Sequence, residues 1–82
     1  MALNENEVLA GLQEIVAEET GLDAAEVTSE KSFTDDLDID SLSMMTIVTH
    51  AEDKFSVRIP DDEVKNLTTV GDAVKFITAA QD

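Results

Sequence analysis

Apolar residues recur at helical spacing in three separate segments of this 82-residue chain. At 100° per residue, the apolar residues of each segment fall on one face, which predicts three amphipathic helices packed around a shared core. Phe76 is expected at the edge of the third face. The predicted core residues are Val8, Leu12, Ile15 and Val16; Met44, Ile47, Val48, Ala51 and Phe55; and Val70, Ala73, Val74 and Ile77.

Short polar signals predict where the first and last of these helices begin. Asn4 with Glu7, and Thr69 with Asp72, have the spacing of capping boxes, in which two residues satisfy each other's free backbone amides. Gly21 is well placed to end the first helix in a left-handed turn. The first helix is therefore expected to begin at Asn4 and the last at Thr69.

The middle of the chain predicts two more helices and a long loop. A second helix is expected from Ser41 to about Phe55, because the Asp40 carboxylate can cap the free amides at its start. Pro60 suits the first turn of a short third helix that should continue to about Asn66. The loop before Asp40 is long, but its apolar residues argue for order. The predicted fold is all-α: a small four-helix bundle of three longer helices and one short one, with a long ordered loop between helices I and II.

Size and charge limit the function. Residues 1–82, from Met1 to Asp82, are expected to form one free-standing domain, and 43% hydrophobic residues suffice for a core. A net charge of −14 argues against nucleic acid and anionic membranes and favours basic protein partners. Without cysteine there is neither a disulfide nor a thiolate metal site. Because no signal pattern or membrane-spanning apolar run is present, a cytoplasmic protein is expected.

Ser41 is the candidate reactive residue. It takes the first position of the second predicted helix, where free amides and the positive end of the helix dipole favour a phosphate. Ile39 and Met44 flank the cap and can close a hydrophobic staple. The position suits a phosphoester, although serine is also common at helix starts without any such role.

Two other chemistries fit less well. Asp36, Asp38 and Asp40 imitate the start of an EF-hand loop, but Ser41 and Ile47 stand where that loop needs glycine and glutamate. No metal site is therefore predicted beyond weak divalent binding by clustered carboxylates.

An enzymatic interpretation would pair Ser41 with His50, the single histidine. Nine residues along one helix separate them by about 13 Å and half a turn, so their side chains cannot hydrogen-bond. The rest of the chain offers little catalytic machinery. The sequence thus predicts no enzyme, with His50 on the polar surface.

The triplet Asp40-Ser41-Leu42 in a small acidic chain resembles the attachment site of acyl carrier proteins. A bare triplet is a weak signal, but further blocks in the same order also resemble the family, and the match covers nearly all of the chain. Those blocks are Phe33–Leu37, Ala51–Phe55, Ile59–Asp62 and Thr68–Ala73.

The resemblance implies that Ser41 carries 4′-phosphopantetheine, which a phosphopantetheinyl transferase adds from coenzyme A. The distal thiol would carry acyl chains as thioesters to fatty acid synthase enzymes: ketosynthases, acyltransferases, reductases and dehydratases with basic docking patches. Asp40 would hold the helix start and offer charge to the transferase, and the carrier would be a monomer. A polyketide or other secondary-metabolism carrier is the closest alternative. An acidic interaction module or calcium buffer without a prosthetic group is the alternative from another class.

Two sets of residues are expected to serve this role. Partner docking is assigned to an exposed apolar pair and to carboxylates, namely Leu42, Met45, Glu52, Asp53, Asp61 and Asp62. By resemblance and helical wheels, the acyl chain would lie between helices II, III and IV, in a cavity lined by Phe33, Ile47, Ala51, Ile59, Val64, Leu67 and Ala73.

The sequence departs from the family pattern at three positions. Asp38 stands where many fatty-acid carriers have glycine, which predicts a stiffer loop or a different backbone angle. Ser43 and Thr46 stand where acidic residues are common, so Leu42 and Met45 are expected to carry a larger share of partner contacts. The pattern around the serine looks actinobacterial, and the pathway, primary fatty-acid synthesis or a dedicated polyketide or lipid route, stays open.

Overall fold

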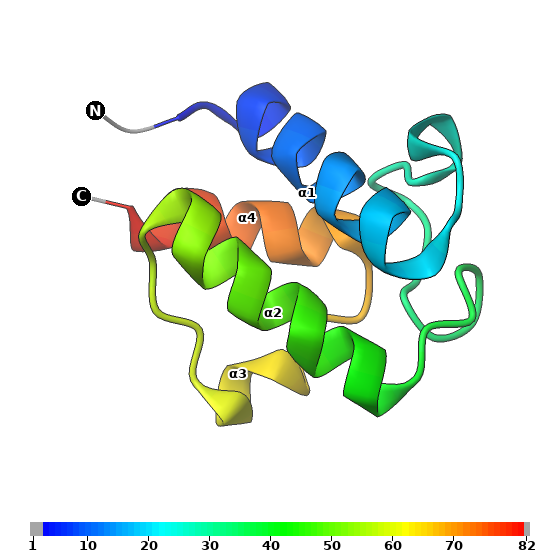
Figure 1. Ribbon diagram of the computed structural model, residues 1–82. Coiled ribbons are helices and arrows are strands. Elements are labelled where there is room, and N and C mark those ends of the chain that lie inside the picture. Colours follow the sequence, from blue (N-terminus) through cyan, green and yellow to red (C-terminus); the bar gives the residue numbers. More distant parts are fainter. Residues whose placement is uncertain (1–2, 82) are drawn as a thin grey trace.

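The computed structural model describes residues 3–81, which form a small bundle of four α-helices (Figure 1). The first helix runs in one direction, and the second and fourth return in the other. Among residues 3–81 no strand forms; the one β-type pairing is an isolated bridge between Ser32 and Thr69. The all-α four-helix prediction is confirmed. The elements are α1 Glu5–Thr20, the 3-10 helix η1 Ala24–Glu26, α2 Ser41–Phe55, α3 Asp61–Val64 and α4 Val70–Ala80.

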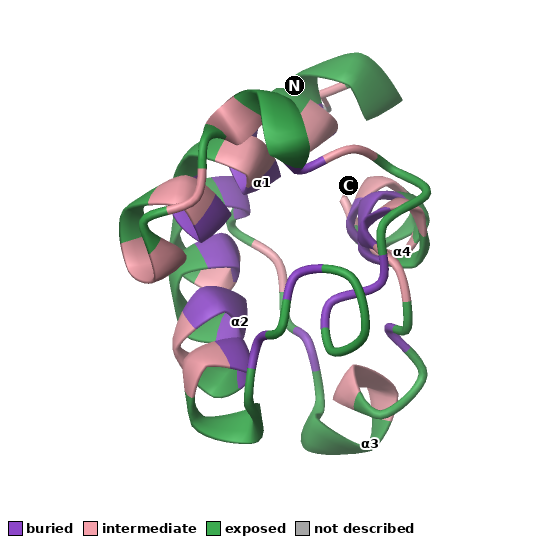
Figure 2. Cartoon of the chain, turned by 90° about the vertical axis from the view of Figure 1, so that its right-hand side faces the viewer, coloured by how far each residue is buried: buried purple, intermediate pink, exposed green. Residues whose placement is uncertain are grey.

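The core is the one predicted from the helical pattern. Every residue assigned to the three predicted core faces is buried, and the buried faces of α1, α2 and α4 turn toward the middle of the molecule (Figure 2). Phe76 is half-buried at the edge, as predicted. The connecting segments add further buried side chains: Val27, Phe33, Leu37, Ile39, Ile59 and Leu67.

The end signals of α1 and α4 act as the sequence predicts. Both capping boxes form, the Asn4 side chain accepting from the Glu7 amide and the Thr69 side chain from the Asp72 amide. Gly21 ends α1 with a φ of 80°, a left-handed conformation that glycine adopts without steric cost. These boundaries follow from local hydrogen bonding.

Helix α3 is shorter than predicted. It ends at Val64 rather than near Asn66, and Pro60 is its N-cap rather than part of its first turn. After Val64 the amides of Asn66 and Leu67 bond to carbonyls three residues back, those of Glu63 and Val64. This tighter pattern continues the turn without extending the α-helix.

A turn around Ser32 orders the loop between α1 and α2. The Ser32 side chain is buried, and its hydroxyl accepts from the amides of Asp35 at 2.9 Å and Asp36 at 3.2 Å. The Asp36 carboxylate in turn accepts from the Ser32 amide at 2.8 Å. Each partner therefore satisfies the backbone of the other, which confirms that this loop is ordered.

The same loop is joined to the start of α4. The Phe33 amide donates to the Thr68 carbonyl at 3.0 Å, and the Gly71 amide donates to the Ser29 carbonyl at 2.8 Å. A Cβ at Gly71 would lie 2.9 Å from that Ser29 oxygen, so glycine permits this close approach. Through these bonds α4 helps to fix the loop that leads to Ser41.

Candidate functional site

Ser41 is the first residue of α2, and its side chain is exposed. Asp40 is the N-cap, and its carboxylate accepts from the Ser43 amide at 2.8 Å. This bond from the Ser43 amide, helped by the Ser43 hydroxyl, holds the pKa of the Asp40 carboxyl below its ordinary value against a small opposing effect of burial. The predicted cap is therefore confirmed, and it presents the serine to solvent at the positive end of the helix dipole.

The lowered pKa predicts how the start of α2 responds to acid. A carboxyl whose folded pKa is depressed stabilises the folded state above its ordinary pKa of 3.8, and that contribution is lost as the pH falls through the folded value. We expect the Ser43 amide to lose its NMR protection only as the pH falls below 3.8, through the lowered pKa of Asp40, whereas an Asp40→Asn variant, which caps without titrating, should show little such change. Equal acid sensitivity of the two proteins would contradict this account.

The loop reaches Ser41 through a left-handed residue. Asp38 has a φ of 54°, and the next amide, that of Ile39, donates to the Phe33 carbonyl at 2.8 Å. The buried Ile39 side chain then anchors the chain immediately before the cap. Asp38 thus adopts a left-handed conformation, which glycine favours and which aspartate tolerates better than most residues.

Replacing Asp38 by Gly should therefore leave stability unchanged or raise it by up to about 1 kcal/mol, because glycine reaches positive φ without strain. Asp38→Val should instead lower stability by roughly 1–2 kcal/mol, since a β-branched residue is strained there. Urea unfolding of the three proteins measures both effects. If the Val and Gly variants have the same midpoint, the left-handed conformation does not constrain this position.

A mostly apolar pocket of about 480 Å³ opens beside Ser41, between the start of α2 and α3. Three of the seven residues predicted to line an acyl cavity, Phe33, Val64 and Leu67, line this pocket. Sequence reasoning placed Met44 only in the core, yet it also contributes to the pocket wall. The other four predicted cavity residues are buried in the core and do not line this pocket: Ile47, Ala51, Ile59 and Ala73.

The predicted docking residues fall into two groups. Leu42 is 80% exposed and Met45 39% exposed, so both are available on the surface near the serine. Asp53, Asp61 and Asp62 are also exposed. Glu52 differs: it is half-buried, and its carboxylate accepts from the Ile59 amide at 2.7 Å.

The remaining candidates do not form a second reactive site. His50 is exposed on α2, as predicted, and lines a shallow pocket with residues of α1 that does not include Ser41. The carboxylates of Asp36 and Asp40 are bonded to backbone amides. Within residues 3–81, no three His, Cys, Asp or Glu side chains gather in a way that could hold a metal ion. In the same part of the chain, no helix has the length and apolar character needed to cross a membrane.

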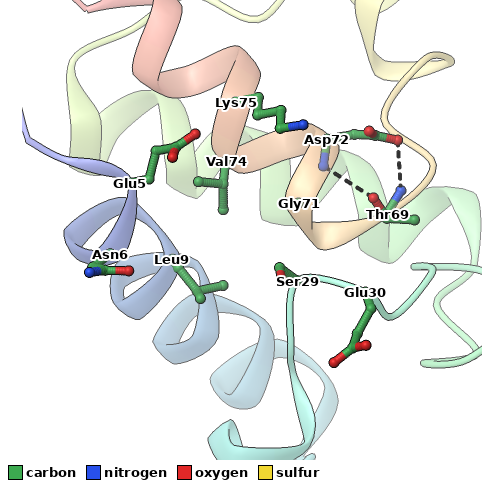
Figure 3. Close-up of a pocket in the computed structure, with 10 residues that line it drawn as sticks. All are labelled: Glu5, Asn6, Leu9, Ser29, Glu30, Thr69, Gly71, Asp72, Val74 and Lys75. Atoms are coloured by element: carbon green, nitrogen blue, oxygen red, sulfur yellow. Dashed lines mark hydrogen bonds between the residues drawn. The ribbon is translucent and has the colours of Figure 1, made fainter.

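A second pocket, of about 380 Å³, lies between the start of α1, the loop near Ser29 and the start of α4 (Figure 3). None of the predicted site residues lines it. Part of its wall is the Thr69–Asp72 capping box, whose two hydrogen bonds fix the start of α4. These polar groups have a structural role.

Comparison with known proteins places the site in a family. Residues 10–77 match the family model described as a phosphopantetheine attachment site. An acyl carrier protein of Beutenbergia cavernae is 75% identical over 81 residues, covering 99% of both chains. One of Micrococcus luteus is 74% identical over 78 residues, covering 95% of this chain and 96% of the relative. This chain belongs to the acyl carrier proteins.

A solved structure supports the same assignment for the carrier's fold. An acyl carrier protein from Enterococcus faecalis aligns with a TM-score of 0.80 at 33% identity, covering 96% of this chain and all of that one. The resemblance seen in the sequence is confirmed, and with it 4′-phosphopantetheine as the cofactor and the role of carrying acyl chains, which in this family usually serves fatty acid synthesis. The acidic module without a prosthetic group is not favoured.

Proposed function

We propose that Ser41 carries the 4′-phosphopantetheine of this carrier, through which acyl chains are delivered as thioesters to the enzymes of fatty acid synthesis. The observation that supports this most is the exposed Ser41 side chain at the first position of α2, beside an apolar pocket. An arm attached there can leave the bundle unchanged while its cargo lies within reach of the pocket. The arm supplies the thiol that forms the thioester; the chain itself contains no cysteine.

The residues around Ser41 prepare it for modification without catalysing it. Asp40 holds the first turn of α2 and presents a carboxylate to a basic phosphopantetheinyl transferase. The transferase supplies the metal ion and the general base. In the cytoplasm, where coenzyme A is available, the carrier then raises the effective concentration of acyl groups at each partner and performs no turnover of its own.

We further propose that partners dock over the start of α2 and over α3. The exposed Leu42 and Met45 side chains supply apolar contact, and Asp53, Asp61 and Asp62 supply charge. Basic patches on ketosynthases, acyltransferases, reductases and dehydratases complement that charge, and the net charge of −14 steers them toward a monomeric carrier.

The acyl chain is proposed to enter the pocket beside Ser41, between Phe33, Val64 and Leu67. A longer chain would continue toward the side chains behind the pocket, which pack closely in the core and must move apart to admit it. These are Ile47, Ala51, Ile59 and Ala73.

The test is an intact-mass spectrum of the unmodified protein after incubation with coenzyme A and a broad-specificity transferase. We expect a mass gain of one phosphopantetheine, which peptide mapping assigns to Ser41. An unchanged mass, with a control carrier fully loaded in the same mixture, would contradict the proposal. Passing the loaded carrier to reconstituted fatty acid synthase enzymes then tests the pathway.

A further inference from the structure

Glu52 lies in the last turn of α2, and its carboxylate forms a hydrogen bond to the backbone of the segment that follows this helix. Oε2 accepts from the Ile59 amide at 2.7 Å, seven residues further on. The Glu52 side chain is half-buried, whereas that of its neighbour Asp53 is exposed. A short bond from an amide to a carboxylate is stronger than one between neutral groups, so this contact constrains Ile59.

Segment 57–67, which carries α3, has few other polar connections. The Val57 amide donates to the Glu52 carbonyl at 3.2 Å, where α2 ends. The amides of Glu63, Val64, Asn66 and Leu67 all donate to carbonyls within the segment. As far as the structure describes the chain, the Glu52–Ile59 bond is the one hydrogen bond that joins residues 58–67 to another element.

This segment also forms one side of the pocket beside Ser41. Asp61, Val64 and Leu67 line the pocket. Helix α3 itself has four residues, about one turn, which is too short to be stable without support. Two buried side chains flank it and support it from the core, Ile59 at 4% exposure and Leu67 at 7%.

We propose that Glu52 is a positioning residue for the pocket wall. Its carboxylate fixes the Ile59 amide, Ile59 fixes the start of α3, and α3 closes the side of the pocket beside Ser41. Glu52 thus acts within the carrier, and the outward-facing acidic contact for partners at this end of α2 is Asp53. This assigns different roles to two adjacent carboxylates that the sequence grouped together.

Amide hydrogen exchange on the unmodified protein tests the Glu52–Ile59 hydrogen bond, here called the tether, independently of any carrier function. In Glu52→Ala we expect exchange at Ile59 to accelerate about tenfold, because its amide loses its acceptor. Glu52→Gln keeps a carbonyl oxygen at the same reach and should stay within about threefold of wild type. Asp53→Asn is the matched control and should leave the Ile59 rate unchanged. Equal rates in all four proteins, or a Gln variant as fast as the Ala variant, would overturn the tether.

A second readout rests on the proposed function. Hydroxylamine should cleave a long-chain acyl thioester on the Glu52→Ala carrier several times faster than the same thioester on wild type. On the Glu52→Gln carrier the cleavage rate should match that of wild type. Transferase binding should weaken more in Asp53→Asn than in Glu52→Gln. The reverse order of binding would overturn the assignment of roles. If no variant accepts phosphopantetheine, the carrier function fails, while the exchange rates still decide whether the tether exists.

Discussion

Replacing Ser41 by Ala is expected to abolish phosphopantetheine loading, because the side chain then has no oxygen to form the phosphoester. The fold should not change. The Ser41 side chain is exposed, and the hydrogen bonds described for residues 3–81 include none to its hydroxyl. Asp40 would still accept from the Ser43 amide, so α2 keeps its cap. Intact mass measures the loading, and far-UV circular dichroism measures the helix content.

The neighbouring serine provides a matched control. Ser43 is also in the first turn of α2, and Ser43→Ala keeps the backbone amide that bonds to Asp40. This variant should gain the same mass as wild type. A mass gain in Ser41→Ala, or its loss in Ser43→Ala alone, would move the attachment site away from Ser41.

The structure shows which parts of the site were readable from sequence. The starts of α1, α2 and α4 were predicted correctly, because each depends on a side chain and an amide three residues apart, such as Asp40 with Ser43. The end of α3 was predicted wrongly, because Pro60 indicates only where the helix begins and the sequence after Val64 contains no residue that signals a helix end. Short capping patterns in the sequence therefore predict helix starts, but they do not predict where a helix without a stop signal ends.

The missed interactions are those that depend on how the chain folds back. No local sequence pattern indicates that the Glu52 carboxylate accepts a hydrogen bond from the amide of Ile59. Ser32 was missed for a different reason, since a serine followed by Asp35 and Asp36 is a recognisable local turn pattern. That signal could have predicted how the loop before Ser41 is ordered.

Phe33→Ala is expected to have the largest effect on stability. The side chain is 1% exposed, and truncating a buried phenylalanine costs about 3–5 kcal/mol. Domains of this size are stable by only about 5–15 kcal/mol, so the variant should melt roughly 15 °C or more below wild type. Phe76→Ala is the control: it removes the same atoms from a half-buried position at the edge of the core. Equal losses in melting temperature would show that burial does not set the effect.

The same variant also tests what the pocket is for. Phe33 lines the pocket beside Ser41, so its truncation enlarges the space offered to a tethered acyl chain. A chain that enters the enlarged space binds the folded state alone and must stabilise it. Attaching a medium-length acyl group should therefore raise the melting temperature of Phe33→Ala more than that of wild type. The rise in the melting temperature of Phe76→Ala should be no larger than that of wild type. If acylation raises all three melting temperatures equally, the acyl chain does not lie against Phe33, and the pocket beside Ser41 is not its entrance.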